Sequence, residues 1–233
     1  KKKITYKTMF EKIELTKAAL IANRVKKSDN VIMFTSSSPE LVYSLFAICR
    51  IGAVANMINP IFTHEQIIDR VNETDAVIMF VLDQLFDRIQ PILPKLCIKK
   101  IVIISAFDEM PAVTKMVASV KTKKHIPYSD KIVRWRTFIS EGKNTNKTTD
   151  AMYENDMPLV MVNSSGTTNR PKGIVLTNKG INSTIIHYDS PNFSYKRGNK
   201  FLQIIPCFAS TGLVLSLLMP LYFGIIVILE PLY

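Results

Sequence analysis

Short apolar segments alternate with amphipathic ones along the first half of the chain. The apolar segments are rich in β-branched residues and lack the in-out alternation of a half-solvated sheet, which is typical of parallel strands covered on both faces. We expect such strands at 31–35, 53–58, 76–81 and 100–105 and, after a gap, at 158–163. The pattern predicts an α/β protein with a mostly parallel sheet covered by helices on both faces.

The segments between these strands carry local helix signals. Thr5 precedes apolar residues at helical spacing, so we expect a first helix to begin there. The tripeptide 38–40 provides a serine N-cap, a first-turn proline and an early acid, and Gly52 is suited to end this second helix. Thr63 with Gln66 three residues later has the spacing of a capping box, which predicts a third helix.

The second half of the chain is less regular. From 107 to 150 the pattern dissolves, and 140–150 is the most linker-like stretch. The segment 201–229 contains no charge and no histidine, so its length alone would allow a membrane span. Prolines and glycines interrupt it, and it divides into a strand at 201–205, a buried helix at 210–223 and a strand at 224–229. We therefore expect a protein core and no membrane span.

Composition narrows the function classes. The chain has 233 residues and a formal net charge of +11, and much of the excess lies between Lys95 and Lys147. A basic nucleic-acid-binding module is one reading, and it predicts an affinity that falls steeply with salt. No nucleic-acid-binding motif accompanies the lysines, so we favour a solvated surface and expect no nucleic-acid partner. Three widely spaced cysteines predict no disulfide framework and a cytoplasmic location.

Hydroxyl groups, glycine and lysine are concentrated in one loop, which follows the strand at 158–163. Its sequence, residues 164–173, is SSGTTNRPKG. Backbone N–H groups and short hydroxyl side chains can surround phosphate oxygens, and a lysine supplies the positive charge that they need. No two of the eight glycines are closer than seven residues, which excludes GxGxxG, GxSxG and GxxxxGK. The sequence predicts a phosphate-binding loop of another type.

This loop resembles the signature loop of the adenylate-forming (AMP-binding) superfamily, which reads roughly S/T-S-G-S/T-T-G-x-P-K-G. That superfamily includes acyl-CoA synthetases, 4-coumarate-CoA ligases, luciferases and the adenylation domains of peptide synthetases. Further segments resemble the family's landmarks in the same order: Thr5-Tyr6-Lys7, residues 25–29, Ser38-Pro39-Glu40, residues 51–54 and Asn59-Pro60. The resemblance covers nearly the whole chain.

The resemblance implies an ATP-dependent, AMP-forming acid-thiol ligase. In that reaction a carboxylic acid attacks the α-phosphate of ATP, and a thiol, usually that of coenzyme A, then takes the acyl group from the acyl-adenylate. ATP and Mg²⁺ are the implied cofactors. By position, the implied phosphate contacts are Ser164, Ser165, Gly166, Thr167, Thr168, Lys172 and Gly173. Phe208, Ala209 and Gly212 fall in a motif implied to line the acyl pocket, and no catalytic residue or metal ligand is assigned.

Two positions depart from the family pattern. Asn169 stands where the family has glycine, and Ala209 stands where it has histidine. The family's later motifs and its C-terminal domain with the catalytic lysine have no counterpart here. We therefore expect residues 1–233 to form an incomplete N-terminal AMP-binding domain that is inactive alone, with a first lobe at about 1–184 and a second begun at 185–233. A peptide-synthetase-type domain that loads a carrier protein and a catalytically degenerate binding protein are the alternatives.

Overall fold

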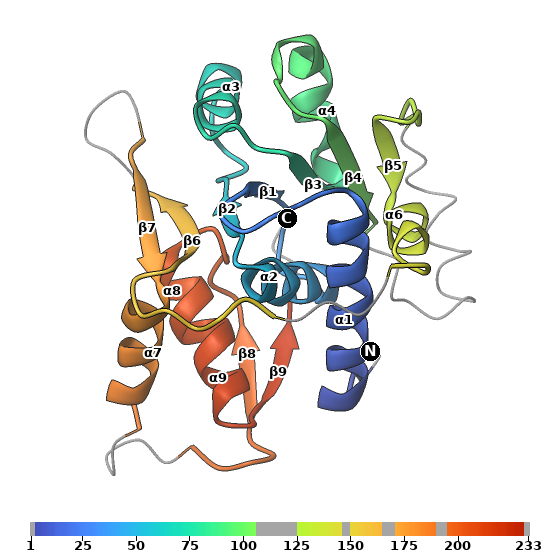
Figure 1. Cartoon of the computed structure of the whole chain (residues 1–233). Coiled ribbons are helices and arrows are strands. Elements are labelled where there is room, and N and C mark those ends of the chain that lie inside the picture. Colours follow the sequence, from blue (N-terminus) through green and yellow to red (C-terminus); the bar gives the residue numbers. More distant parts are fainter. Residues whose placement is uncertain (1–2, 106–124, 146–149, 165–170, 190–194, 231–233) are drawn as a thin grey trace.

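A seven-stranded sheet forms the centre of the protein. We describe a computed structural model that places residues 3–105, 125–145, 150–164, 171–189 and 195–230 (Figure 1). Across the sheet, the strands are β5 (Ile132–Arg134), β4 (Lys100–Ile104), β3 (Ile78–Leu82), β1 (Asn30–Phe34), β2 (Val54–Met57), β6 (Pro158–Asn163) and β7 (Gly173–Thr177). Neighbouring strands are parallel except β6 and β7, which are antiparallel. The predicted α/β class with a mostly parallel sheet is confirmed.

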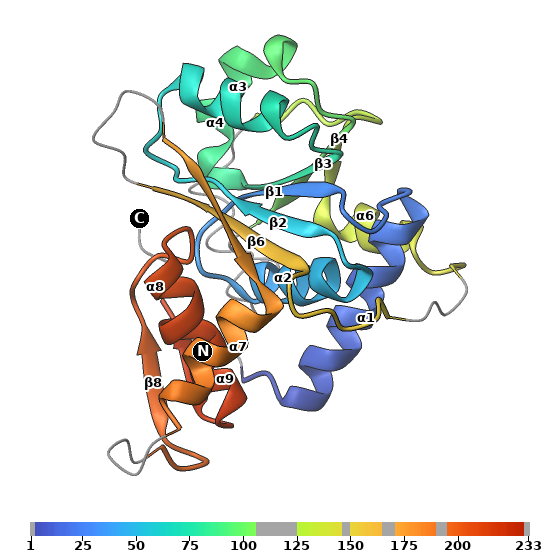
Figure 2. The ribbon, with the colours of Figure 1, turned by 60° about the vertical axis from the view of Figure 1, so that its left-hand side comes forward.

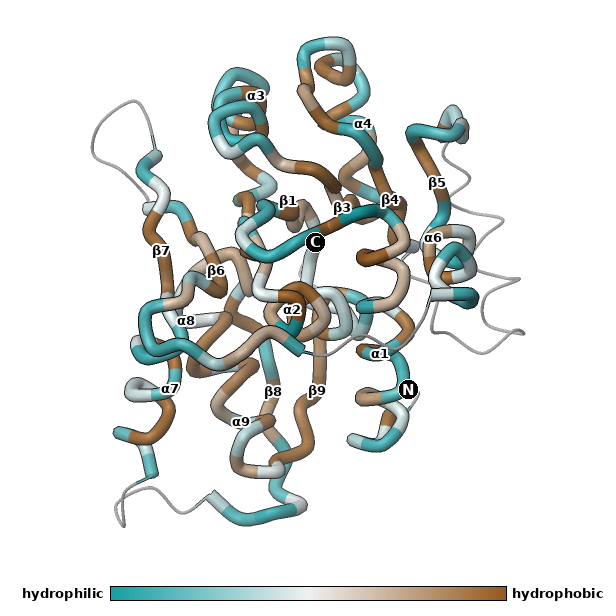
Figure 3. Tube along the Cα trace, viewed as in Figure 1, coloured by the Kyte–Doolittle hydropathy of each residue, from teal (hydrophilic) through white to brown (hydrophobic). Residues whose placement is uncertain are grey.

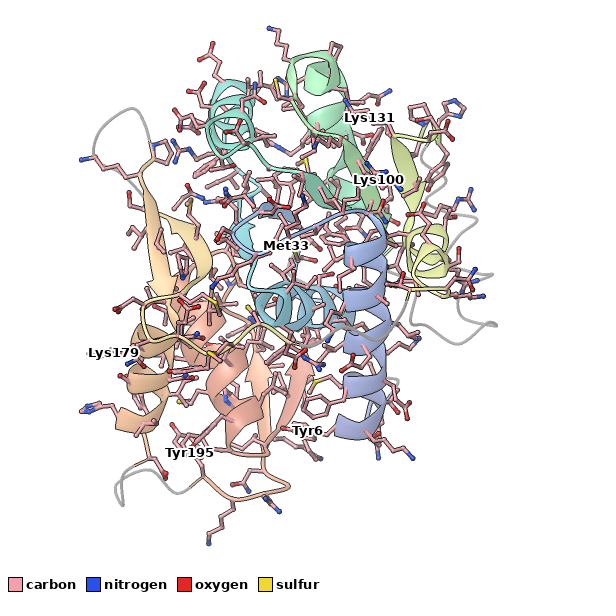
Figure 4. The ribbon with its side chains drawn as sticks, in the orientation of Figure 1. Tyr6, Met33, Lys100, Lys131, Lys179 and Tyr195 are labelled. Carbon is pink, nitrogen blue, oxygen red and sulfur yellow. The ribbon has the colours of Figure 1, made fainter. Side chains whose placement is uncertain are left out.

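Helices cover both faces of the sheet (Figure 2). One face packs against α1 (Tyr6–Ala22), α2 (Pro39–Ile51) and α6 (Trp135–Glu141), and the other against α3 (His64–Glu73) and α4 (Phe86–Ile89). Successive residues of β1 alternate between these layers: Val31 and Met33 enter the first hydrophobic cluster, and Ile32 and Phe34 enter the second. Figure 4 shows Met33 in the middle of the molecule. Both faces are apolar because both are buried.

The helix ends follow the local signals. The Thr5 hydroxyl accepts a hydrogen bond from the Thr8 amide, and the capping box of Thr63 and Gln66 is complete. Gly52 ends α2 with a φ of 78°, in the left-handed region that glycine adopts without strain. These three predictions are confirmed.

The stretch after 82 contains elements that the sequence pattern did not predict. A short helical stretch, Asp83–Lys95, includes α4, and β5 and α6 lie within the segment where no regular structure was expected. These pieces are too short for a clear periodicity. Trp135 and Phe138 hold α6 in place by packing against Phe80, with ring centroids 5.8 Å and 5.4 Å from it.

A second, two-stranded parallel sheet contains β8 (Lys200–Gln203) and β9 (Ile226–Leu229). Figure 3 shows β9 as hydrophobic throughout, whereas the outer helix α3 is mostly hydrophilic. The two strands are joined by α8 (Ser210–Leu213), a π-helical segment (η3, Val214–Leu218) and α9 (Met219–Tyr222). The expected strand, helix and strand are present, but the helix is not uniformly α. Pro220 has no N–H for the Ser216 carbonyl, which removes one α-helical hydrogen bond here.

The two sheets share one core. Ile181 and Ile185 of α7 (Asn178–His187), together with residues of α8 and η3, belong to the same buried cluster as β1 and α2. The Tyr6 hydroxyl also donates a hydrogen bond to the Leu221 carbonyl at 2.9 Å, which joins α1 to α9. The proposed lobe boundary near 184 falls inside α7 and stays a prediction. In the described residues, no helix is long and apolar enough to cross a membrane.

Part of the basic segment can be followed in the structure. Figure 4 shows Lys100 and Lys131 close to β4 and β5, at the edge of the sheet opposite β7. The Lys100 ammonium lies 2.8 Å from the Glu141 carboxylate, and the Arg134 guanidinium lies 4.4 Å from the centre of the Tyr128 ring. Some of these cations therefore make intramolecular contacts.

Candidate functional site

The β6–β7 hairpin holds the two ends of the predicted phosphate loop together. Asn163 and Gly173 are paired in the ladder, and just beyond them the Ser164 amide donates to the Lys172 carbonyl at 2.9 Å. The Lys172 amide in turn donates to the Ser164 hydroxyl oxygen at 3.2 Å. These two hydrogen bonds close the stem and fix where the loop leaves the sheet and where it returns.

Three of the predicted phosphate contacts lie in the described part of the chain: Ser164, Lys172 and Gly173. The others, Ser165, Gly166, Thr167 and Thr168, lie outside the described residues, as does Asn169. The Ser164 hydroxyl accepts a bond from Lys172 and still has its own O–H to donate to an anionic oxygen. Lys172 is exposed, so its ammonium is accessible to a ligand. This donor set fits a phosphate group.

Asn163, the last residue of β6, is a candidate site residue that the sequence analysis did not identify. Its side-chain amide donates to the Met57 carbonyl at 2.8 Å, which ties the end of β6 to the end of β2. Its side-chain oxygen is buried and has no partner among the described residues. Its place between a strand and a hydroxyl-rich loop is the signal that could have identified it.

The stem lies at the carboxyl edge of the parallel strands. From β1 the chain moves to β2 on one side and then crosses to β3 on the other, so β1 is the point where the strand order reverses. In open α/β sheets, ligands bind outside the carboxyl ends of the strands at such a point. The loop after β6 begins two strands away from it.

A small cavity lies at this same edge. Its volume is about 60 Å³, and it is lined by residues 35–37 after β1, by Pro60 after β2 and by residues 206–208. Two of its lining residues are in contact, because the Ser37 hydroxyl lies 3.5 Å from the Cys207 sulfur. The hydroxyls at 35–37 were not identified from the sequence, although they directly follow a buried strand.

The three acyl-pocket candidates have different surroundings. Phe208 lines the cavity. Ala209 is the N-cap residue of α8. Gly212 is buried, and a Cβ there would overlap the Pro206 carbonyl oxygen and lie 2.6 Å from that of Ile205, so this glycine lets the 205–206 backbone lie directly on α8. An acyl-binding role for these residues stays a prediction.

Cys207 is not suited to act as a nucleophile. Its burial raises the pKa of the thiol to about 11, and the hydrogen bond with Ser37 only partly opposes this effect. Gln203 also donates its side-chain N–H to the sulfur at 3.4 Å. At neutral pH the group is therefore a thiol, which is much less reactive than a thiolate.

No metal site is assigned from the geometry. Among the described residues, no three His, Cys, Asp or Glu side chains are arranged to hold a metal ion. His64 is the first residue of α3 and belongs to no such arrangement in the described part of the chain. The site as described offers donors for an anion and no ligand set for a cation.

A parallel sheet with a hydroxyl and lysine loop at its carboxyl edge is typical of α/β proteins that bind nucleotides. The family model for the AMP-binding enzyme matches residues 1–232, and the chain belongs to that family. It is 31% identical over 182 residues to an acetyl-coenzyme A synthetase of Helicobacter pylori, a match that covers 76% of this chain and 26% of the relative. A second acetyl-coenzyme A synthetase, from Pseudoalteromonas atlantica, is 28% identical over 222 residues, covering 91% of this chain and 31% of the relative.

Solved structures agree on the fold. An anthranilate CoA ligase in complex with anthranoyl-AMP superposes with a TM-score of 0.83 at 20% identity, covering 100% of this chain and 41% of that one. A benzoate CoA ligase from Burkholderia xenovorans gives 0.77 at 15% identity, covering 98% and 40%. The chain spans about a quarter of the length of the first curated relative.

Proposed function

We propose that the protein containing this chain is an ATP-dependent, AMP-forming acid-thiol ligase of the acyl-CoA synthetase type. The observation that carries the proposal is the closed stem at the carboxyl end of β6, where Ser164 and Lys172 meet. Membership of the AMP-binding family supports the same reaction class. We do not expect residues 1–233 alone to catalyse it, because they span only part of the relatives.

The stem residues have distinct roles in this proposal. Lys172 places a positive charge where the leaving phosphates would lie, and Ser164 donates its hydroxyl hydrogen to the same group. ATP, when bound, would supply the adenylyl group and the pyrophosphate leaving group, and a Mg²⁺ ion bound with it would neutralise part of their charge. Such reactions depend mainly on positioning and charge neutralisation, which this stem can provide.

We propose a carboxylic acid as the substrate and coenzyme A as the acyl acceptor. Support for coenzyme A comes from the curated relatives, which are acetyl-coenzyme A synthetases. A carrier-protein thiol is the alternative acceptor. We also propose a cytoplasmic location, because Cys49, Cys97 and Cys207 are all free thiols.

The test is carboxylate-dependent exchange of labelled pyrophosphate into ATP, measured on the whole protein with a panel of acids. Exchange that requires one of the acids would support the proposal. Subsequent addition of coenzyme A or of a carrier protein then distinguishes the acceptors. Binding of ATP without exchange for any acid would instead favour a degenerate binding protein.

A further inference from the structure

Arg70, on α3, lies against the stem of the candidate phosphate loop although the two are far apart in the sequence. A Cβ placed on Gly173 would lie 3.4 Å from a terminal guanidinium nitrogen of Arg70 and 2.8 Å from the Met161 sulfur. Gly173 directly follows Lys172. The missing side chain at Gly173 therefore leaves room for a guanidinium beside the point where the loop returns to the sheet.

The Arg70 side chain is held in this place. Its neighbours Ile67 and Val71 are buried in the core, which fixes the position of α3 on the sheet. The guanidinium forms an ion pair with Glu73 one helical turn later, and the side chain is only 15% exposed. A partly desolvated, fixed cation acts on a nearby anion more strongly than a flexible, hydrated one.

We propose that Arg70 contributes its positive charge directly to the phosphate site. It packs against Gly173, the residue that follows Lys172, and its charge adds to that of Lys172 in attracting a polyphosphate. This inference rests on the proposed function, because it requires that the stem binds the phosphates of ATP. Helix α3 would thus add a positive charge to the phosphate site that does not come from the loop itself.

The effect of the Arg70 charge on phosphate binding is tested by calorimetry, in which Mg·ATP and pyrophosphate are titrated into the whole protein. Arg70→Met keeps much of the packing volume and removes the charge, so we expect affinity about fivefold weaker and a shallower salt dependence. Arg70→Lys should restore most of the affinity. Arg136→Gln, at the opposite edge of the sheet, removes an equal charge from an exposed position and should leave the affinity unchanged.

A second variant keeps the test independent of any folding defect in Arg70→Met. In Glu73→Gln, Arg70 should stay packed against Gly173, but its positive charge is no longer offset by a carboxylate. The Glu73 side chain is half exposed, so the fold should persist. We expect tighter binding of pyrophosphate and a lower KM for ATP, with kcat nearly unchanged. Binding no tighter than that of the unchanged protein would overturn the role of Arg70.

The outcomes separate the two proposals. If the unchanged protein binds neither ATP nor pyrophosphate, the proposed function fails and this inference fails with it. If the unchanged protein binds both and Arg70→Met binds them equally well with the same salt dependence, only the role of Arg70 is overturned.

Discussion

The central strand β1 and the edge strand β7 belong to one sheet but are held by different forces. Four of the five residues of β1 are buried, whereas the first three residues of β7 are exposed. Burial on two faces fixes β1, while β7 depends on its ladder with β6 and on the polar contacts of the stem. The centre of the sheet therefore contributes most to folding stability, whereas the candidate phosphate site lies at its edge. A mutation should be able to change one without changing the other.

The largest expected loss of unfolding free energy comes from a mutation in the centre of the seven-stranded sheet. Phe80→Ala removes a fully buried ring that packs on Trp135 and Phe138, and it should cost about 3–5 kcal/mol of unfolding free energy. Urea unfolding measures this loss. If the folded fraction of the variant also loses ATP affinity at low temperature, the separation of centre and edge is wrong.

A smaller loss of unfolding free energy is expected from a mutation in the segment that leads into β6. Asp150 accepts a hydrogen bond from the buried Lys17 at 2.6 Å and another from Arg50 at 2.8 Å. Asp150→Asn leaves the Lys17 ammonium with a weaker partner, so we expect a loss of about 1–3 kcal/mol. Lys27→Ala, which breaks the exposed pair with Glu154, is the control and should cost less than about 1 kcal/mol.

The contacts of Asp150 with Lys17 and Arg50 also predict that the unfolding free energy depends on pH. Burial raises the pKa of Asp150, but the hydrogen bonds from Lys17 and Arg50 outweigh it, and the pKa of that carboxyl is lowered overall. Its stabilising contribution is therefore complete above the unfolded pKa of about 4 and is lost as the pH falls through the lower folded value. Asp150→Asn should reduce the loss of stability in acid, and an identical acid profile for both proteins would contradict this.

At the stem, Ser164→Ala removes the acceptor of the Lys172 amide while the backbone bond remains. We expect a cost of about 1 kcal/mol, seen as roughly fivefold weaker ATP binding, with little change in unfolding. Ser164→Thr keeps a hydroxyl and should bind almost normally. Equal binding by all three proteins would mean that the Ser164 hydroxyl contributes to ATP binding neither through the stem nor by donating to the phosphates.

The smallest effect should come from the exposed face of β7. Ile174→Thr changes a side chain that is 48% exposed, so the unfolding free energy should shift by no more than about 0.5 kcal/mol. The matched change in the centre, Ile32→Thr, buries a hydroxyl and should cost about 2 kcal/mol or more. Similar losses of unfolding free energy for both variants would contradict the difference proposed between β1 and β7.

The features predicted correctly from the sequence are those set by neighbours in the chain. The capping box at Thr63 and the left-handed end at Gly52 depend on a few adjacent residues, and the buried strands have a continuous apolar pattern. The π-helical segment, β5 and α6 were missed because they depend on tertiary packing or are too short to show a period.

The candidate site divides in the same way. The loop could be proposed as a phosphate site from the sequence because its hydroxyls, glycines and lysine are contiguous, and this proposal stays a prediction. The contact of Arg70 with Gly173 and that of Asn163 with Met57 join distant segments, so no local pattern indicates them. The cavity near Ser37 and Cys207 likewise exists only where the two parts of the chain meet.

The most direct test of the central claim, that this stem binds the phosphates of ATP for adenylation, is pyrophosphate exchange by Lys172→Ala in the whole protein. The control is Lys179→Ala, which removes an exposed lysine on α7 (Figure 4). We predict at least about a hundredfold loss of exchange for Lys172→Ala, normal unfolding, and unchanged exchange for Lys179→Ala. Unchanged exchange by folded Lys172→Ala would contradict the account.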